Sequence, residues 1–185
     1  MTATTMILAD RVFDRSRATD VVLIGAGALI TALAAQIQIP MFPVPMTLQT
    51  LAVLLVGASL GLKRGSISMT LYLLLGAVGL PVFAGAKTLT GVLPTSGYLV
   101  GFVAAAALVG WLASKGFSSS PLKVAFSFAL GSTLIYSLGT LGLMLTLGLS
   151  FPQALAAGVA PFILGDVAKA LAAAALLPLA WKLTK

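Results

Sequence analysis

The chain has 185 residues, of which 59% are hydrophobic and 8% are charged, and its net charge is +7. A mean hydropathy of +1.12 lies outside the range of soluble domains, so the positive charge does not indicate a soluble nucleic-acid-binding protein. The sequence contains neither cysteine nor histidine, which excludes disulfides and thiolate or zinc-thiolate sites, and no metal or cofactor is expected.

Apolar segments of about 16 to 26 residues recur along the chain, and most are long enough for a helix that crosses a bilayer. We therefore expect an all-α integral membrane protein with six transmembrane helices, at residues 20–38, 46–62, 65–82, 96–113, 124–148 and 157–181. The domain organisation that follows is an N-terminal tail at residues 1–19 and a single six-helix membrane domain at residues 20–185.

Lysine and arginine are distributed unevenly between the predicted loops. Nine of the 11 lie in the N-terminal tail, in every second loop and at the C-terminal end, namely Arg11, Arg15, Arg17, Lys63, Arg64, Lys115, Lys123, Lys182 and Lys185. The alternate loops contain only Lys87, and Lys169 lies inside a predicted helix. By the positive-inside rule, both termini are predicted to be cytoplasmic in a multi-pass protein of the cell membrane.

The first predicted helix has small residues four apart at Ala28 and Ala32. Small side chains at this spacing let another backbone approach closely, which is the usual route to helix association in lipid. We expect this face to pack either on another helix of the same chain or on a separate subunit.

The loop after this helix contains Pro40, Pro43 and Pro45. Three prolines so close together prevent helix formation and favour an extended, stiff segment, which we expect at the outer surface. Thr47 and Gln49 follow where the next helix opens. A capping role explains Thr47, whereas the Gln49 amide needs a hydrogen-bond partner and is a candidate ligand contact, with Thr47 beside it.

The longest predicted outer loop collects glycines, hydroxyl groups and Lys87. It ends in Thr95, Ser96 and Gly97, where a helix N-terminus presents free N–H groups suited to a carboxylate or carbonyl oxygen. Tyr98 on the first turn fits either a ligand contact or the aromatic belt at the membrane interface. Lys87 is either a cation for an anionic ligand or a solvated loop charge.

The last predicted helix carries two opposite charges, Asp166 and Lys169, in an otherwise apolar run. Their spacing places both side chains on one face of a helix, roughly 14 and 18 Å from its outer end. A lone charge near the middle of a spanning helix costs about 2.5–3.5 kcal/mol, so such groups usually face a partner, a cavity or a substrate. The two residues are therefore either a structural ion pair or part of a binding site.

These polar residues belong to the outer loops or the outer halves of helices, and we expect them to line one external pocket. A cation and helix N–H groups suit an anionic end of a ligand, and a carboxylate with an amide suits a neutral group that has N–H donors and a carbonyl. Phe83, Met46 and Val44 suit an aliphatic connector. The residues imply a small amphiphilic ligand with a carboxylate.

Four stretches of the sequence resemble the motifs of one family, the BioY family, at residues 43–50, 71–85, 94–102 and 162–169. Its members are the biotin-binding S components of energy-coupling-factor transporters. The similarity runs in the same order over nearly the whole chain and implies a six-helix S-component fold that holds biotin near the outer surface. It further implies that Asp166 serves the ureido ring and Lys169 the valerate carboxylate, with these residues around them: Gln49, Thr95, Ser96, Gly97 and Tyr98.

The same resemblance implies a subunit for biotin uptake that is not an enzyme, with biotin as the transported ligand. Its partners would be membrane lipid, a coupling transmembrane subunit that contacts Ala28 and Ala32, and ATPase subunits. The glycines before Lys63 lack the spacing of a phosphate loop, so ATP hydrolysis has to come from other subunits. A homo-oligomer is a further option, and no nucleic acid is expected.

Two other functions would make different use of the charged residues in the last predicted helix. An ion-coupled secondary transporter of a small carboxylate-bearing vitamin would use Asp166 as its ion site, but inverted repeats with broken helices and a second intramembrane carboxylate are not evident. An intramembrane enzyme would need a Ser-Lys pair built on Lys169, since histidine and cysteine are absent.

Overall fold

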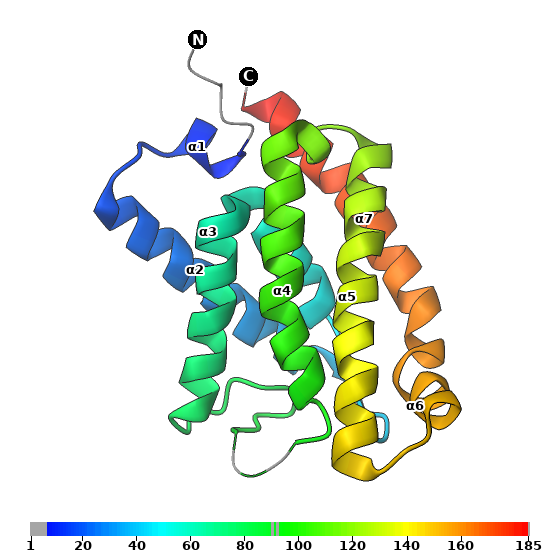
Figure 1. Cartoon of the computed structure of the whole chain (residues 1–185). Helices are drawn as coiled ribbons and strands as arrows, with labels where there is room; N and C mark the ends of the chain where they lie inside the picture. Colours follow the sequence, from blue (N-terminus) through cyan, green and yellow to red (C-terminus); the bar gives the residue numbers. More distant parts are fainter. Residues whose placement is uncertain (1–6, 90, 92, 185) are drawn as a thin grey trace.

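The computed structural model describes residues 7–89, 91 and 93–184 (Figure 1). Residues 1–6 of the predicted N-terminal tail, and Lys185, lie outside the described residues. The helices are α1 (Ala9–Val12), α2 (Arg17–Gln36), α3 (Gln49–Ala77), α4 (Ser96–Leu112), α5 (Pro121–Leu147), α6 (Phe151–Gly158) and α7 (Ile163–Leu183), with a π-helical turn at Ala113–Phe117 and a 3-10 turn at Ala160–Phe162. Two short antiparallel strands, β1 (Gln38–Ile39) and β2 (Met46–Thr47), form a hairpin.

Helix α3 changes direction at Gly61, whose backbone has φ 82° and ψ 178°. Glycine adopts this left-handed region without the steric cost that a Cβ brings. A Cβ on Gly65 would lie 3.0 Å from the Cα of Gly57, so the residues on either side of Gly61 fold back against each other. The predicted spans 46–62 and 65–82 therefore meet at a real break in the helix.

Five helical stretches among the described residues are long and apolar enough to cross a membrane, with α3 counted once and α6 and α7 counted together. This agrees with the expected multi-pass, mostly helical membrane protein. The count of six spans and the cytoplasmic position of both termini stay predictions. Large apolar side chains such as Leu29, Leu145 and Leu164 are exposed on the outside of the bundle, which suits contact with lipid.

The bundle packs α4 between α3 and α5, and α7 lies along α5 (Figure 1). Helix α2 packs on α3, and the small residues of α2 lie partly in this contact. Ala28 is 1% exposed within the core, and Ala32 is half-buried against it. Packing inside the chain, one of the two alternatives for this face, therefore accounts for Ala28.

The short helix α1 closes one end of the bundle. Ile7 is buried against Gly61, and Asp10 accepts a hydrogen bond of 2.6 Å from the Arg64 guanidinium. Burial acts to raise the pKa of Asp10, but hydrogen bonds from Arg64 and Arg15 lower this pKa below its ordinary value. Arg11 lies 5.0 Å from the ring centroid of Trp181, so α1 and the C-terminal end of α7 share this end of the molecule.

The opposite end carries the β hairpin and the loop between α3 and α4 (Figure 1). The predicted extended, proline-rich segment forms this hairpin, a short sheet that the all-α prediction did not include. The predicted helix 157–181 is wrong at its start, because α7 begins only at Ile163. Pro161 has no N–H to donate, and the chain passes through a 3-10 turn there before α7 begins. Asp166 consequently lies in the first turn of α7 and not midway along a helix.

Candidate functional site

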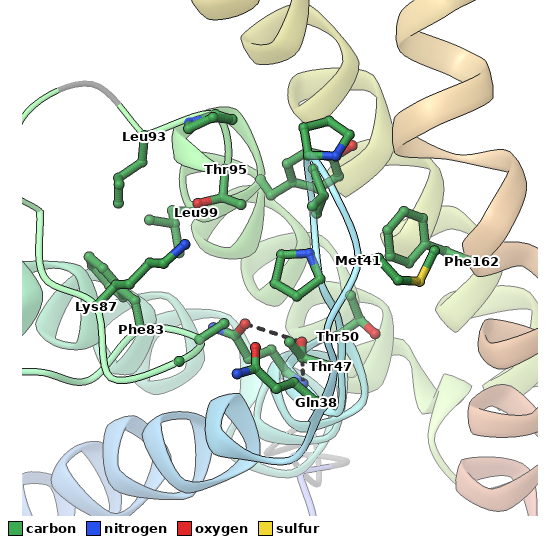
Figure 2. A pocket seen from close by; sticks show the side chains of 18 of the residues that line it. Gln38, Met41, Thr47, Thr50, Phe83, Lys87, Leu93, Thr95, Leu99 and Phe162 are labelled. Carbon is green, nitrogen blue, oxygen red and sulfur yellow. Dashed lines mark hydrogen bonds between the residues drawn. The ribbon is translucent and has the colours of Figure 1, made fainter.

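A cavity of about 320 Å³ lies between the β hairpin and the loop that connects α3 to α4 (Figure 2). The first turns of α3 and α4, the middle of α5 and the start of α7 complete its wall. Most of the wall is apolar, from Pro40, Met41, Phe42, Pro43, Val44, Pro45, Phe83, Leu93, Leu99, Phe102 and Phe162. Eight of the residues predicted for the pocket line it, namely Val44, Thr47, Gln49, Phe83, Lys87, Thr95, Tyr98 and Lys169.

Hydrogen bonds fix Thr47 and Gln49 on the cavity wall. The Thr47 hydroxyl donates to Gln49 Oε1 at 3.1 Å and accepts from the Gln49 backbone N–H at 3.2 Å. Gln49 Nε2 donates to the hydroxyl of Tyr72 at 2.6 Å. Because both ends of this buried amide are bonded, its orientation is set before any ligand arrives.

The two opposite charges of α7 form an ion pair beside the cavity. Lys169 Nζ lies 2.9 Å from Asp166 Oδ1 and donates to the Thr50 hydroxyl at 2.8 Å. The hydroxyl of Tyr136 donates to Asp166 Oδ2 at 2.6 Å. The side chains of Lys169 and Asp166 are only 12% and 13% exposed. Residues from α3, α5 and α7 thus meet in one polar cluster, which we call the α7 charge cluster: Thr50, Tyr136, Asp166 and Lys169.

This cluster separates two pockets. Lys169, Thr50 and Tyr136 line the cavity described above, and they also line a neighbouring pocket of about 250 Å³ between α3, α5 and α7. Asp166 lines only the neighbouring pocket. Lys169 is therefore accessible from the main cavity, whereas Asp166, its ion-pair partner, faces the neighbouring pocket.

Lys87 is the second cation at the cavity. It is exposed and belongs to the turn after α3, and Figure 2 shows its side chain and that of Thr95 directed into the space under the hairpin. Within residues 7–89, 91 and 93–184, no carboxylate lies within ion-pair distance of Lys87. The charge of Lys169 is thus neutralised by Asp166, whereas the charge of Lys87 is available to an anion.

Ser96 and Gly97 were predicted for the site but do not line the cavity. Gly97 lies where α4 crosses α5: a Cβ there would overlap the carbonyl oxygen of Leu138 and lie 2.9 Å from the Cα of Gly142. The backbone N–H of Ser96 donates to Leu93 O at 3.0 Å and so is not free for a ligand.

Tyr98 lines the cavity but is 5% exposed, and its hydroxyl donates to the carbonyl of Gly158 at 2.7 Å. A tyrosine of the aromatic belt at the membrane interface, one of the two alternatives for Tyr98, would be more exposed than this buried side chain. The ring of Tyr98 packs edge-on against Tyr136, with 6.3 Å between centroids.

Sequence reasoning missed Tyr136 and Gln38, and it did not assign Thr50 to the site. Tyr136 lies in the middle of an apolar helix. Its phenol needs a hydrogen-bond partner in a bilayer, and this requirement could have indicated that Tyr136 belongs to a polar site. The partner is Asp166, 30 residues further along the chain. Such a pairing depends on how α5 packs against α7, which the sequence alone does not give.

The chemistry of the cavity wall suits the binding of a ligand with an apolar part and polar ends. Among the described residues, no group of three or more histidine, cysteine, aspartate or glutamate side chains could hold a metal ion. The apolar wall suits a hydrocarbon chain, the exposed Lys87 suits an anion, and the α7 charge cluster with Gln49 offers donors and acceptors for a polar neutral group.

The sequence is similar to those of one known family. A model of the BioY family matches residues 5–185. The chain is 42% identical over 164 residues to a protein of Thermotoga maritima named biotin transporter BioY, covering 82% of this chain and 90% of that one. It is 38% identical over 160 residues to the biotin transporter BioY of Rhizobium etli, covering 80% and 85% of the two chains.

Among solved structures, the chain resembles the S-component for biotin from an ECF-type ABC transporter. The TM-score is 0.79 at 22% sequence identity, covering 92% of this chain and 94% of that one. This likeness shows a common fold.

Proposed function

The chain belongs to the BioY family, and on that premise we propose that it is a membrane-embedded biotin-binding subunit that mediates biotin uptake. The observation that carries the proposal is that the two ends of the cavity differ. At one end Lys169 is paired with Asp166, and at the other end Lys87 has no carboxylate partner among the described residues. Biotin has a ureido ring at one end and a carboxylate at the other, joined by an aliphatic chain. The chemistry of the cavity matches that order.

We assign the ureido ring to the α7 charge cluster and the carboxylate to Lys87 and Thr95. Lys169 is already engaged by Asp166 at 2.9 Å and Thr50 at 2.8 Å, so its remaining donor capacity suits a neutral carbonyl oxygen better than a full negative charge. This reverses the role that the family resemblance implied for Lys169. The apolar wall between the two ends would contact the aliphatic chain.

We further propose six membrane spans with both termini in the cytoplasm of a cell membrane. The reversal at Gly61 supports two crossings within α3. The contact between Arg11 and Trp181 supports an even number of crossings, because it brings α1 and the end of α7 to the same end of the bundle. Arg11, Arg15, Arg64 and Lys182 belong to that end, as the positive-inside rule requires of a cytoplasmic surface.

The proposed subunit would bind and deliver biotin, and it would not catalyse a reaction itself. A coupling transmembrane subunit and ATPase subunits would supply the energy, as an S-component fold suggests. Ala28 is already covered by its own chain, so a coupling subunit would meet α2 at Ala32 and at the exposed Leu29 and Leu33 beside it.

An ion-gradient experiment separates this function from secondary transport. The purified chain alone, in proteoliposomes, is expected to bind biotin but not to accumulate it when a proton or sodium gradient is imposed, because no ion site is required for binding. Labelled biotin inside the vesicles is measured with and without each gradient, and vesicles without protein are the control. Gradient-driven accumulation by the chain alone would contradict the proposal and favour an ion-coupled transporter.

A further inference from the structure

Gln36 does not line the cavity, yet it holds the turn that carries Lys87 and Phe83. It is the last residue of α2. Its Nε2 donates to the carbonyl oxygen of Phe83 at 3.2 Å, and its Oε1 accepts from the backbone N–H of Ala86 at 3.1 Å. One amide side chain thus bonds both a C=O and an N–H of the same turn, as a neighbouring strand would.

The turn itself is closed by backbone bonds. Phe83 N donates to Lys87 O at 3.0 Å, and Lys87 N donates to Phe83 O at 3.3 Å. Ala86 at its apex has φ 55°, a left-handed backbone that is uncommon for a residue with a Cβ and needs support from its surroundings. Gln36 provides that support, since it bonds the N–H of this strained residue.

A second residue outside the cavity holds the same turn from the core side. The hydroxyl of Tyr72 donates to the carbonyl of Val82 at 3.1 Å while it accepts from Gln49 Nε2 at 2.6 Å. Its ring packs edge-on against Phe83, with 5.3 Å between centroids. The Val82–Phe83 backbone is therefore fixed by Gln36 on one side and by Tyr72 on the other.

We propose that Gln36 is a positioning residue for ligand binding, which acts through the turn to hold Lys87 at the carboxylate end of the cavity, and that Tyr72 fixes the same turn together with Gln49. This inference rests on the proposed function, because it takes biotin as the ligand. Neither residue lines the cavity.

The test compares biotin with biotinamide, in which a neutral amide replaces the carboxylate, on the full-length purified chain. Gln36→Leu is expected to weaken biotin binding about five- to tenfold, the size expected when two hydrogen bonds to the turn are lost. It should change biotinamide binding by less than about twofold, since Lys87 matters little to a neutral group. In a Lys87→Met background, Gln36→Leu should add almost no further loss, because the two residues act in series.

Gln153→Leu is the matched control. Gln153 is another amide at a helix end whose Oε1 accepts a backbone N–H, from Ser150 at 2.9 Å, but it lies outside the cavity wall. This control should bind biotin as the wild type does. Tyr72→Phe should weaken binding of both compounds, because it also releases Gln49.

The inference is overturned if Gln36→Leu binds biotin normally, if it weakens biotin and biotinamide equally, or if its effect simply adds to that of Lys87→Met. A wild-type chain that binds no biotin would overturn the proposed function and this inference together. Normal wild-type binding with any of the first three results would overturn this inference alone.

Discussion

The double variant Asp166→Asn/Lys169→Met is expected to fold normally and to lose affinity for biotin by about 10- to 100-fold, since a hydrogen bond to a charged group contributes about 1.5–3 kcal/mol and each 1.4 kcal/mol is tenfold in affinity. Lys169 is the member of the α7 charge cluster that lines the cavity, and Asp166 orients it from behind. The double variant removes the Lys169 ammonium, which we assign as the donor to the ureido carbonyl, and the Asp166 carboxylate, which holds that ammonium in place.

The double variant separates ligand binding from stability better than either single variant does. Asp166 and Lys169 are 13% and 12% exposed, and leaving one buried charge without its partner costs about 3–5 kcal/mol of stability. Lys169→Met or Asp166→Asn alone is therefore expected to lose stability as well as binding. The double variant leaves no uncompensated charge, so its loss of binding reports on the ligand contact.

The measurement is equilibrium biotin binding, paired with a thermal melting midpoint for each protein in the same detergent. Lys63→Met, which removes an exposed lysine near the α1 end of the bundle, is the control and should bind biotin normally. Wild-type affinity in the double variant would return Asp166 and Lys169 to a purely structural role.

A substitution at Gly97 is expected to have the largest effect on folding. Gly97→Val should destabilise the protein by about 3 kcal/mol or more, at the upper end of overpacking effects, because the obstacle is backbone and not a movable side chain. A Cβ at this position overlaps Leu138 O and lies 2.9 Å from the Cα of Gly142. The contact between α4 and α5 would have to open to admit a side chain.

Ser96→Ala is the matched control, since Ser96 is the neighbouring residue and does not line the cavity. It should leave both the melting midpoint and biotin binding unchanged. The yield of folded protein and the melting midpoint are measured for both variants. If Gly97→Val melts like the wild type yet binds no biotin, the glycine contacts the ligand, as the sequence motif implied, and the packing account is wrong.

Much of the site could be predicted because the predicted membrane topology assigns each loop to the outer or the inner face of the membrane. Thr47 belongs to one predicted outer loop, and Phe83, Lys87 and Thr95 belong to the next, so the predicted topology assigns all four to the same face of the membrane. Helices that cross a bilayer place such ends at one face, where they can meet, and in the structure all four residues line one cavity. The same argument could not tell which of them point inward.

What the sequence could not give is the packing between particular helices. Gly97 was read as a ligand contact because it begins a helix, whereas its role depends on Gly142 of α5 lying opposite it. Nothing in the sequence singles out Tyr136 in its apolar helix, although its hydroxyl donates to Asp166 Oδ2 at 2.6 Å. The sequence also predicts Asp166 too far along its helix, because the 3-10 turn containing Pro161 delays the start of α7 to Ile163.

Equilibrium binding of biotin to the purified wild-type chain in lipid nanodiscs, with no other subunit present, tests the central claim most directly. We predict saturable binding of one biotin per chain, competed by unlabelled biotin, because the cavity lies within a single chain and both of its ends are already formed. A chain that is folded by its melting transition but binds no biotin would contradict the assignment of the cavity to biotin.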